Sequence, residues 1–434
     1  MATATSGPPG TRDSVPRARW YRVGLLLFLI YLVAYIDRTN ISVAAPSMEK
    51  GLGLSSATTG VLLSAFFWGY VITQVPGGWA ASRINAKIVV IAALVVWGVG
   101  AIGTGLVTTY DQLLAVRVLM GLAEGVVWPS FTVMIMNWYP DREQGRAMNI
   151  VEIALPLSSV VASPIAGVMI AAWSYHAMFI LQGIPAFVLA IVFALIVGVH
   201  PSTDRMLSAA ERRYLEANQA TGAKPRGSFT EVLANPRIWI LGVIYFLWVS
   251  GLYAFGLWVP SFISQLSQDG IGLVGLLSAI PFVVAAVSMY INARISDRPG
   301  FNRAWSVIVP LAIGGVALLI QHWIGDGLWL NMVFLMVAGI GIYAAFGPWW
   351  AWAASQVPKN QTGPSMGLIN FMGNFGGIVG PIVVGLAAGG GNLSNGFYIL
   401  GIALLIGAVG TALVGVRGRS PASEPASAIP AQRT

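Results

Sequence analysis

Twelve long apolar stretches run through the chain, and each is long enough to cross a lipid bilayer as a helix, which takes about 20 residues. Lipid offers backbone groups no hydrogen-bond partners, so a helix that satisfies them internally is the expected form of each stretch. Only 9% of the residues are charged, against about a quarter in soluble domains. The sequence therefore predicts an all-α integral membrane protein with 12 transmembrane helices. They are expected at about 22–47, 57–81, 87–108, 112–136, 147–172, 177–199, 238–264, 271–293, 304–323, 328–356, 364–388 and 394–416.

The basic residues alternate with the predicted spans in the way that sets membrane orientation. With both termini placed in the cytoplasm, Arg38 and Arg117 lie within spans, only Lys50 falls outside, and the other 21 of the 24 Lys and Arg residues fall in cytoplasmic segments. Cytoplasmic loops of membrane proteins carry such an excess. We therefore expect a multi-pass protein of the inner or plasma membrane with cytoplasmic termini. The same bias explains the net charge of +8 without a nucleic-acid partner.

The spans fall into two halves of equal length, residues 20–199 and 237–416. Pro164 and Pro381 lie at the same offset from the first residue of their halves, and each is followed by Ile. We predict two six-helix bundles related by pseudo-two-fold symmetry, an architecture typical of transporters. The remaining segments are predicted to be a cytoplasmic linker with short helices and two disordered cytoplasmic tails, at 200–236, 1–19 and 417–434.

Two Ser-x-x-Glu patterns in the linker predict helix starts. Ser208 with Glu211, and Ser228 with Glu231, fit the capping box, in which the two side chains satisfy free backbone N–H groups. We expect two short surface helices joined by a flexible stretch at 221–227. The linker is interpreted as a tether between the halves.

The composition argues against several kinds of site. The chain has no Cys and three scattered His residues, so it offers no disulfide, no thiolate and no paired metal-ligand spacing. It lacks the Gly-x-x-x-x-Gly-Lys-Ser/Thr phosphate loop that ATP-driven proteins use. An enzyme within the membrane would need a nucleophile–base pair or metal ligands in its spans. We expect no metal, no cofactor and no enzymatic activity, and the short outside loops leave no ligand domain for a receptor.

Five ionisable residues lie inside the predicted spans, all in the first half: Asp37, Arg38, Arg117, Glu124 and Glu152. A charge at the centre of a span costs roughly 2.5–3.5 kcal/mol, so such residues persist where they face water or each other. We expect Arg38 and Arg117 to bind an anionic substrate, because a guanidinium matches a carboxylate with two parallel hydrogen bonds. Asp37 and Glu124 are the predicted proton-coupling sites.

Alternative roles stay open for these charges. Arg117 and Glu124 are seven residues apart, about 10.5 Å along a helix, which is too far for a direct pair and leaves Glu124 free to titrate. Asp37 and the two Arg residues would otherwise form a packing ion pair that closes the extracellular side. Glu152, near the start of its span, either reaches the interface, pairs with Arg146 or takes part in transport.

Four short motifs stand out, and they read Tyr35-Ile36-Asp37-Arg38-Thr39-Asn40, Ser64-Ala65-Phe66-Phe67-Trp68-Gly69-Tyr70, Arg117-x-x-x-Gly121-x-x-Glu124-Gly125 and Asn370-Phe371-Met372-Gly373-Asn374-Phe375-Gly376-Gly377. Together they resemble the major facilitator superfamily, and more closely its anion:cation symporter family of bacterial galactonate, hexuronate and phthalate permeases. The resemblance covers residues 20–416. It implies the major facilitator fold and the import of organic anions, usually driven by protons. It also aligns four residues with substrate-contacting positions: Tyr35, Tyr70, Trp350 and Asn370.

The second half contributes aromatic and amide side chains. Trp349, Trp350 and Trp352 cannot all face one way on a helix, so we interpret the outer two as packing or interface residues. Asn370 and Asn374 are four residues apart and share a face. Buried amides need partners, so this pair binds either a ligand carboxylate or hydroxyl, or a carbonyl of a neighbouring helix.

The loop between the second and third spans departs from the superfamily pattern Gly-x-x-x-Asp-Arg-x-Gly-Arg-Lys. Ser82 stands where Asp is usual, and Asn85 stands where the inner Gly is usual. The second half keeps Asp297 and Arg298. The resemblance assigns these two residues and Arg83 to a cytoplasmic charge lock that stabilises the outward-open state. We expect the lock to be weaker on the N-terminal side.

These residues favour a secondary transporter that imports an organic carboxylate by proton symport with alternating access. Amide and hydroxyl groups favour a sugar acid or a similar small organic anion, whereas the stacking surface of Trp350 would suit an aromatic acid. A drug/proton antiporter fits less well, because a cationic substrate would prefer a cavity without Arg. The expected partners are a small organic anion, protons and the lipid bilayer, and we expect the protein to act as a monomer.

Overall fold

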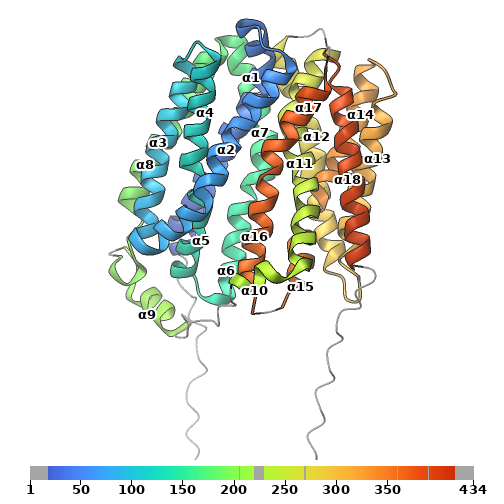
Figure 1. Cartoon of the computed structure of the whole chain (residues 1–434). Coiled ribbons are helices and arrows are strands. Elements are labelled where there is room, and N and C mark those ends of the chain that lie inside the picture. Colours follow the sequence, from blue (N-terminus) through green and yellow to red (C-terminus); the bar gives the residue numbers. More distant parts are fainter. Residues whose placement is uncertain are drawn as a thin grey trace, which may run out of the picture. The chain divides into compact units, whose positions relative to one another are not determined.

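The computed structural model describes residues 18–204, 206–218, 229–267, 270–358, 360–389 and 391–415 (Figure 1). All regular structure within these ranges is helical, which confirms the predicted all-α class. The chain divides into two compact units. Unit 1 comprises the described residues of 1–226 with 259–279, and unit 2 comprises those of 227–258 with 280–434. The predicted tails lie outside the described residues, apart from residues 18 and 19.

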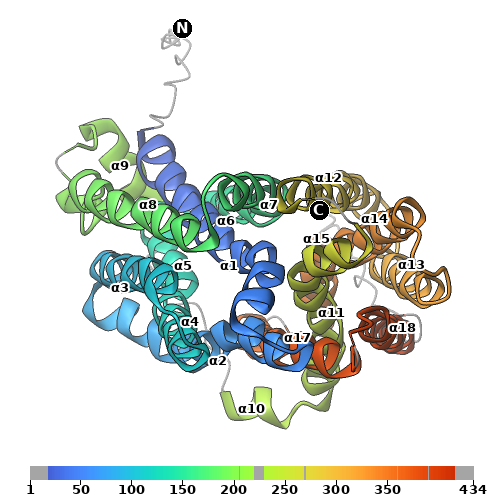
Figure 2. The same cartoon turned by 90° about the horizontal axis from the view of Figure 1, so that it is seen from above.

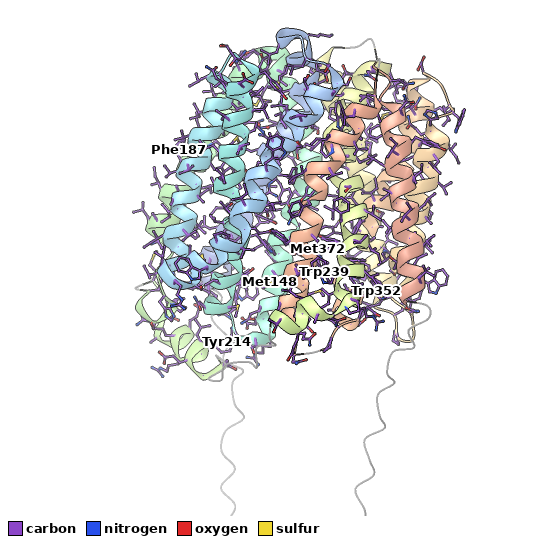
Figure 3. The ribbon with its side chains drawn as sticks, in the orientation of Figure 1. Met148, Phe187, Tyr214, Trp239, Trp352 and Met372 are labelled. Atoms are coloured by element: carbon purple, nitrogen blue, oxygen red, sulfur yellow. The ribbon has the colours of Figure 1, made fainter. Side chains whose placement is uncertain are left out.

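Unit 1 is built from the first helices of the chain. After a π-helical turn at Trp20–Gly24, they are α1 (Leu25–Leu52), α2 (Ser56–Ala80), α3 (Ala86–Leu106), α4 (Tyr110–Glu124), α5 (Val127–Trp138), α6 (Asp141–Glu152), α7 (Ala154–Ala172), α8 (Tyr175–Ile196) and α9 (Ala209–Asn218). Seen from above, α8 lies beside α3 (Figure 2). Phe187 of α8, labelled in Figure 3, packs on α3 so closely that a Cβ added to Gly98 would lie 2.7 Å from its ring.

Unit 2 contains the later helices. They are α10 (Phe229–Ala234), α11 (Pro236–Leu266), α12 (Ile271–Ser296), α13 (Trp305–Gln321), α14 (Leu328–Ala344), α15 (Phe346–Ser355), α16 (Thr362–Asn374), α17 (Gly376–Ala387) and α18 (Ser394–Gly415). The C-terminal end of α11 and the N-terminal end of α12 belong to unit 1. Met372 of α16 lies against Gly242 of α11, and Trp352 of α15 lies against the end of α18 (Figure 3).

The helices account for the twelve predicted spans. Ten helical runs in the described part of the chain are long and apolar enough to cross a membrane. One of them, Ser56–Leu106, has 51 residues and holds two predicted spans. Asn85 separates these two, because its backbone is extended (φ 175°, ψ 126°) and its side-chain oxygen accepts from the N–H of Lys87 at 2.8 Å to cap α3. The shorter apolar helix Trp305–Gln321 supplies the remaining span.

Four of the predicted spans each consist of two helices. The breaks lie at residues 125–126, Ile153, Ala345 and Phe375. Ile153 (φ −57°, ψ −24°) and Phe375 (φ −61°, ψ −24°) keep right-handed backbone angles, so the span bends there without reversing. The affected spans are the fourth and fifth of each half, so the breaks recur in corresponding places. The apolar pattern of the sequence predicts one uninterrupted helix for each of these spans, and the breaks correct that prediction.

Two glycines allow α2 and α4 to touch along their backbones. A Cβ added to Gly69 would lie 2.5 Å from the backbone nitrogen of Leu122, and one added to Gly121 would lie 2.9 Å from the carbonyl carbon of Phe66. Close approach through small residues is a common way for membrane helices to pack. The contact fixes Phe66 against α4, next to the buried charges described below.

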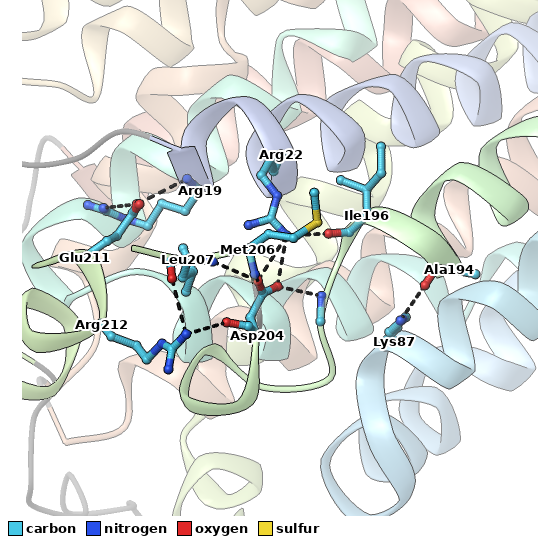
Figure 4. Close-up of polar contacts among 11 residues, drawn as sticks. Arg19, Arg22, Lys87, Ala194, Ile196, Asp204, Met206, Leu207, Glu211 and Arg212 are labelled. Atoms are coloured by element: carbon cyan, nitrogen blue, oxygen red, sulfur yellow. Dashed lines mark hydrogen bonds and ion pairs between the residues drawn. The ribbon is translucent and has the colours of Figure 1, made fainter. Parts of the chain in front are cut away.

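Helix α9 is attached to unit 1 by Arg19, which lies just before the first span (Figure 4). Arg19 Nη1 lies 2.8 Å from Oε1 of Glu211 on α9, and the backbone N–H of Arg19 donates to the same oxygen at 3.2 Å. The Arg19 guanidinium also pairs with Glu143 on α6. Burial acts to lower the pKa of Arg19, but the two carboxylates outweigh it and hold that pKa above its ordinary value.

The first predicted capping box forms only in part. The N–H of Glu211 donates to Ser208 Oγ at 3.1 Å, as predicted, but the Glu211 carboxylate binds Arg19 instead of capping the Ser208 N–H. Helix α9 is therefore docked on unit 1, and the role of the whole linker as a tether between the halves stays a prediction. The second box begins at Ser228, which lies outside the described residues together with 221–227, and α10 begins at the next residue.

Asp204 holds the turn between α8 and α9 (Figure 4). Its carboxylate accepts from Arg22 Nη2 at 3.0 Å, from the N–H of Met206 at 2.7 Å and from the N–H of Gly198 at 2.9 Å. Burial acts to raise the pKa of Asp204, but these hydrogen bonds and the Arg22 charge hold that pKa below its ordinary value. The turn is thus stabilised by a charged carboxylate.

Candidate functional site

The buried charges of unit 1 gather around Arg38. This residue lies on α1, and Glu124 is the last residue of α4, directly before the break at 125–126. Arg38 Nε donates to Glu124 Oε2 at 2.8 Å, and the two side chains are 7% and 0% exposed. The partner of Glu124 thus comes from another helix and not from Arg117 of α4 itself, and the proton-coupling role of Glu124 stays a prediction.

Three aromatic rings surround the Arg38 guanidinium. Its Cζ lies 4.5 Å from the ring centre of Tyr35, 4.9 Å from that of Phe66 and 4.7 Å from that of Tyr70. A cation over an aromatic face gains about 0.5–2 kcal/mol, more when the site is dry. Tyr35 and Tyr70, both predicted from the family resemblance, thus lie directly against the charge that was predicted to bind substrate.

Asp37 binds a different set of partners. Its Oδ2 accepts from Trp97 Nε1 at 2.8 Å, and its Oδ1 accepts from Asn40 Nδ2 at 3.2 Å. Asn40 also donates to Gln182 Oε1 at 2.8 Å, so the network joins α1, α3 and α8. In the described part of the chain no Arg lies within ion-pair distance of this carboxylate. The predicted packing ion pair between Asp37 and the two Arg residues is therefore wrong.

Arg117 lies deeper than Arg38 and is only 1% exposed. Its Nη1 donates to the backbone carbonyl of Asp37 at 3.3 Å, and its Cζ lies 5.6 Å from the ring centre of Phe66. These contacts hold α4 against α1. In this structure the Arg117 side chain has no exposed surface at which it could bind a substrate, and its predicted role as a substrate clamp stays a prediction.

Three buried polar atoms of this cluster have no hydrogen-bond partner among the residues that the structure describes. They are Arg38 Nη1, Arg117 Nε and Glu124 Oε1. Most buried polar atoms in proteins are paired, so such atoms call for an explanation. An anion would accept a hydrogen bond from the free guanidinium nitrogen, and the free carboxylate oxygen of the same ion pair is the atom that would take up a proton.

An aromatic cluster is the main feature of the predicted site residues in unit 2. Trp349 is buried and stacks on Tyr245, with ring centres 5.3 Å apart and planes at 11°. Trp350 is half-buried and meets Tyr245 edge-on at 5.0 Å, while Trp352 packs on Trp349 at 5.4 Å. Trp349 and Trp352 are both buried, and among the three Trp residues Trp350 alone is half-buried.

The two predicted amides lie on α16, just before its break from α17. Asn374 Nδ2 donates to the backbone carbonyl of Asn370 at 3.0 Å. Asn374 is buried and Asn370 is half-buried. The spacing of four residues places them on one face, and part of the hydrogen-bonding capacity of Asn374 is used within its own helix.

The predicted lock residues are exposed. Arg83 follows α2, and Arg298 follows α12. Asp297 pairs with Arg303 at 3.5 Å, with the two side chains 73% and 45% exposed. An exposed pair of this kind contributes little to stability. The lock itself stays a prediction.

Glu152 ends α6 at the bend before α7 and is half-buried. Arg146, its proposed partner, lies over the ring of Trp20 at 5.1 Å, and no ion pair joins it to Glu152 within the described ranges. The predicted Glu152–Arg146 pair is therefore wrong. Within those ranges no three His, Asp or Glu side chains gather into a possible metal site.

Several residues of these clusters were not recognisable as functional residues from the sequence. Phe66 and Asn40 lie inside the quoted motifs but had no predicted role. No sequence pattern marked the other three, Trp97, Gln182 and Tyr245, as functional. An isolated Trp, Gln or Tyr in an apolar span looks the same in the sequence whether it packs or binds a charge.

The helices and the buried charges define a class of protein: a polytopic helical membrane protein with an ionisable site inside its spans, as secondary transporters have. The sequence profile of the Major Facilitator Superfamily matches residues 27–381. The chain belongs to this superfamily. It is accordingly a transport protein and not an enzyme.

Named relatives cover nearly the whole chain. A candidate tartrate transporter of Agrobacterium vitis is 30% identical over 91% of this chain and 90% of its own. A quinolone resistance transporter of Acinetobacter baumannii is 26% identical over 89% of this chain and 92% of its own. A D-galactonate transporter of Escherichia coli is 26% identical over 91% and 95%. The crystal structure of a bacterial homologue of the human lysosomal transporter Spinster shares the fold, with a TM-score of 0.74, 18% identity and coverage of 92% of this chain and 96% of that one.

Proposed function

We propose that the protein is a secondary active transporter that imports a small organic carboxylate together with protons by alternating access. The observation that carries the proposal is the Arg38–Glu124 pair, which is desolvated, surrounded by aromatic rings and left with one unpaired atom on each partner. Relatives named for tartrate and galactonate support an organic acid as the substrate.

The proposed coupling is a competition for Arg38. Without substrate, the Glu124 carboxylate neutralises the guanidinium at 2.8 Å. A substrate carboxylate binds Arg38 with two parallel hydrogen bonds and takes over that role. Glu124 then sits in a dry site without its counter-charge and binds a proton, because an unpaired buried charge is costly. Anion and proton thus become bound together.

Asp37 is the proposed second proton-coupling residue. Its carboxylate is held by the neutral donors Trp97 and Asn40, so its protonation does not depend on displacing an Arg. Arg117 binds the backbone of the same residue and is buried. We assign Arg38 to direct substrate contact and Arg117 to holding α1 and balancing the charge of the cluster.

A sugar acid is the proposed substrate class. Tyr35 and Tyr70 border Arg38, and Asn370 and Asn374 supply amides in unit 2 that suit hydroxyl groups. An aromatic acid is the alternative, supported by the half-buried ring of Trp350. A drug/proton antiporter has one relative named for quinolone resistance in its favour, but the guanidinium at the centre of the cluster disfavours a cationic substrate.

The remaining assignments follow the same proposal. We place the protein in the inner membrane as a monomer with both termini in the cytoplasm. Arg83, Asp297 and Arg298 are proposed to form the cytoplasmic charge lock. The exposed positions of all three are compatible with a contact that forms and breaks during the transport cycle.

Uptake into proteoliposomes tests the proposal. With an inward proton gradient, the wild type should accumulate labelled D-galactonate or tartrate. Glu124→Gln should lose accumulation but keep exchange of bound substrate, and Arg38→Lys should lose both because Lys lacks the planar fork. The exposed pair Glu216→Gln and Arg213→Lys on α9 are the matched controls.

Two results would count against the mechanism. Concentrative uptake by Glu124→Gln would place the driving proton elsewhere, with Asp37 as the next residue to replace. Uptake by Arg38→Lys with unchanged substrate affinity would show that Arg38 does not bind the substrate carboxylate through two parallel hydrogen bonds. Competition by aromatic acids, but not by sugar acids, would select the alternative substrate class.

A further inference from the structure

We propose that a cavity at the turn between α2 and α3 binds the phosphate group of an anionic phospholipid. The cavity has a volume of about 160 Å³ and is lined by residues 81, 82 and 84–87 of the turn, by the end of α5 and by residues 199 and 200 after α8. One water takes up roughly 30 Å³ in the liquid, so a tetrahedral phosphate group fits. All three segments belong to unit 1, and none of them contributes to the cluster around Arg38.

Lys87 supplies the positive charge of this cavity. Its Nζ donates to the backbone carbonyl of Ala194, near the end of α8, at 2.7 Å. This contact anchors the ammonium group, which has three N–H donors, and leaves two of them for a ligand. A fixed ammonium needs less ordering to bind an anion than a freely rotating surface Lys does.

Asn85 adds a second donor from the same turn. Its side-chain oxygen accepts from the backbone N–H groups of Lys87 at 2.8 Å and Ile88 at 3.4 Å, at the start of α3. The oxygen is therefore committed to the helix, and the amide nitrogen is the polar end that remains for a ligand. The partial positive charge of the α3 N-terminus favours an anion at the same place.

Ser82 explains why the cavity suits an anion. No Asp or Glu occurs among the described residues that line it, and the other polar side chains are those of Asn137 and His200. Ser82 stands where the superfamily resemblance predicts Asp, and its hydroxyl donates to the carbonyl of Trp79 at 2.9 Å. An Asp here would set a carboxylate beside Lys87 and compete with a bound phosphate.

The surface around the cavity favours a lipid as the source of that phosphate. Ile84 and Ile88 are 64% and 54% exposed, and Trp79 is 63% exposed. Trp is enriched where membrane meets water, and exposed aliphatic side chains at the end of a span contact acyl chains. Cationic residues at this level attract anionic lipids. A phospholipid with its phosphate beside Lys87 would lay its acyl chains along these apolar residues.

Native mass spectrometry of the purified full-length protein tests the proposal. Phosphatidylglycerol should bind the wild type about tenfold more tightly than phosphatidylcholine does, because the net negative headgroup suits the acid-free lining. Ser82→Asp should lower phosphatidylglycerol affinity by about tenfold, since it adds a like charge to the site. Ser82→Ala is the matched control and should bind as the wild type does, because both keep the Lys87 contact with Ala194.

Two outcomes would overturn the proposal. Equal phosphatidylglycerol affinity in Ser82→Asp and Ser82→Ala would mean that no anion occupies the cavity. A second arm uses glycerol 1-phosphate and inorganic phosphate, which carry the same group without acyl chains and should bind far more weakly than the lipid. If either binds the wild type as tightly as phosphatidylglycerol and is equally sensitive to Ser82→Asp, the natural ligand is a soluble phosphate and the lipid assignment is wrong.

Discussion

Replacing Arg19 by Met is expected to release helix α9 from unit 1. Met keeps most of the apolar length of the side chain but removes the guanidinium that lies 2.8 Å from Glu211. The Glu211 side chain is 0% exposed, so it would remain as a buried charge without a cation. Breaking a buried pair in this way costs about 3–5 kcal/mol. Loss of the Arg19 charge would destabilise Glu143 less, because Glu143 is 19% exposed and also accepts a hydrogen bond from Tyr214 at 2.6 Å.

Trypsin offers a direct assay, because α9 itself carries Arg212 and Arg213. The protease cleaves at these two residues only when the helix leaves unit 1 and unfolds. A loss of about 3–5 kcal/mol corresponds to a rise of about 100- to 4,000-fold in the open population. If opening is fast compared with cleavage, the cleavage rate at these two sites rises by the same factor, up to the rate for an unfolded peptide.

A second substitution separates the buried charge from simple loss of packing. Replacing both partners of a buried pair by apolar residues is often neutral, so Arg19→Met combined with Glu211→Leu should regain most of the protection. Glu216→Gln on the exposed side of α9 should leave cleavage unchanged. A rise of less than tenfold in Arg19→Met, or a double variant as susceptible as the single one, would refute the reasoning.

Thermal unfolding checks three other substitutions in unit 1. Gly121→Ala should destabilise the protein by about 1–3 kcal/mol, because the added methyl meets the backbone of α2. Gly145 has open space around it, so Gly145→Ala should stabilise the protein by about 0.5–1 kcal/mol. Equal melting temperatures of the two variants would contradict both predictions. Trp97→Phe removes a buried N–H donor to the Asp37 carboxylate and should lower the free energy of unfolding by about 1.5–3 kcal/mol. Trp68→Phe, at a more exposed site, should lower it by less, and the reverse order would contradict the prediction. The pKa of Asp204 is near 3.8 in the unfolded chain and lower in the folded chain. The loss of stability in Asp204→Asn should therefore be complete at neutral pH and shrink as the pH falls below 3.8. A loss that grows in acid would show that hydrogen bonds and the Arg22 charge do not stabilise the carboxylate.

The positions of the spans were predictable because they depend only on where long runs of apolar residues occur along the sequence. The stretches expected at 177–199 and 394–416 are the helices Tyr175–Ile196 and Ser394–Gly415. The bends inside spans were not predictable in the same way. Apolar residues continue across Ile153 without interruption, and hydropathy carries no information about backbone angles.

The identity of the buried charges was predictable, but their pairing was not. Arg38 and its partner Glu124 lie 86 residues apart, and helix spacing describes only contacts within one helix. The attachment of Trp97 to Asp37 depends on how α1 and α3 pack. Arg19 was counted only as a charge that sets membrane orientation, yet it is buried and holds α9 to unit 1.

The charge balance of the cluster around Arg38 determines how the membrane potential acts on transport. With both carboxylates ionised, Asp37 and Glu124 contribute two negative charges and Arg38 and Arg117 contribute two positive charges, so the four sum to zero. On the proposed cycle, one monocarboxylate and one proton add no net charge, and the loaded cluster is as neutral as the empty one. Voltage would then do no work on either form as these groups cross the membrane field. A second proton would make the loaded form positive, and each 100 mV, negative inside, would favour its inward movement by about 2.3 kcal/mol.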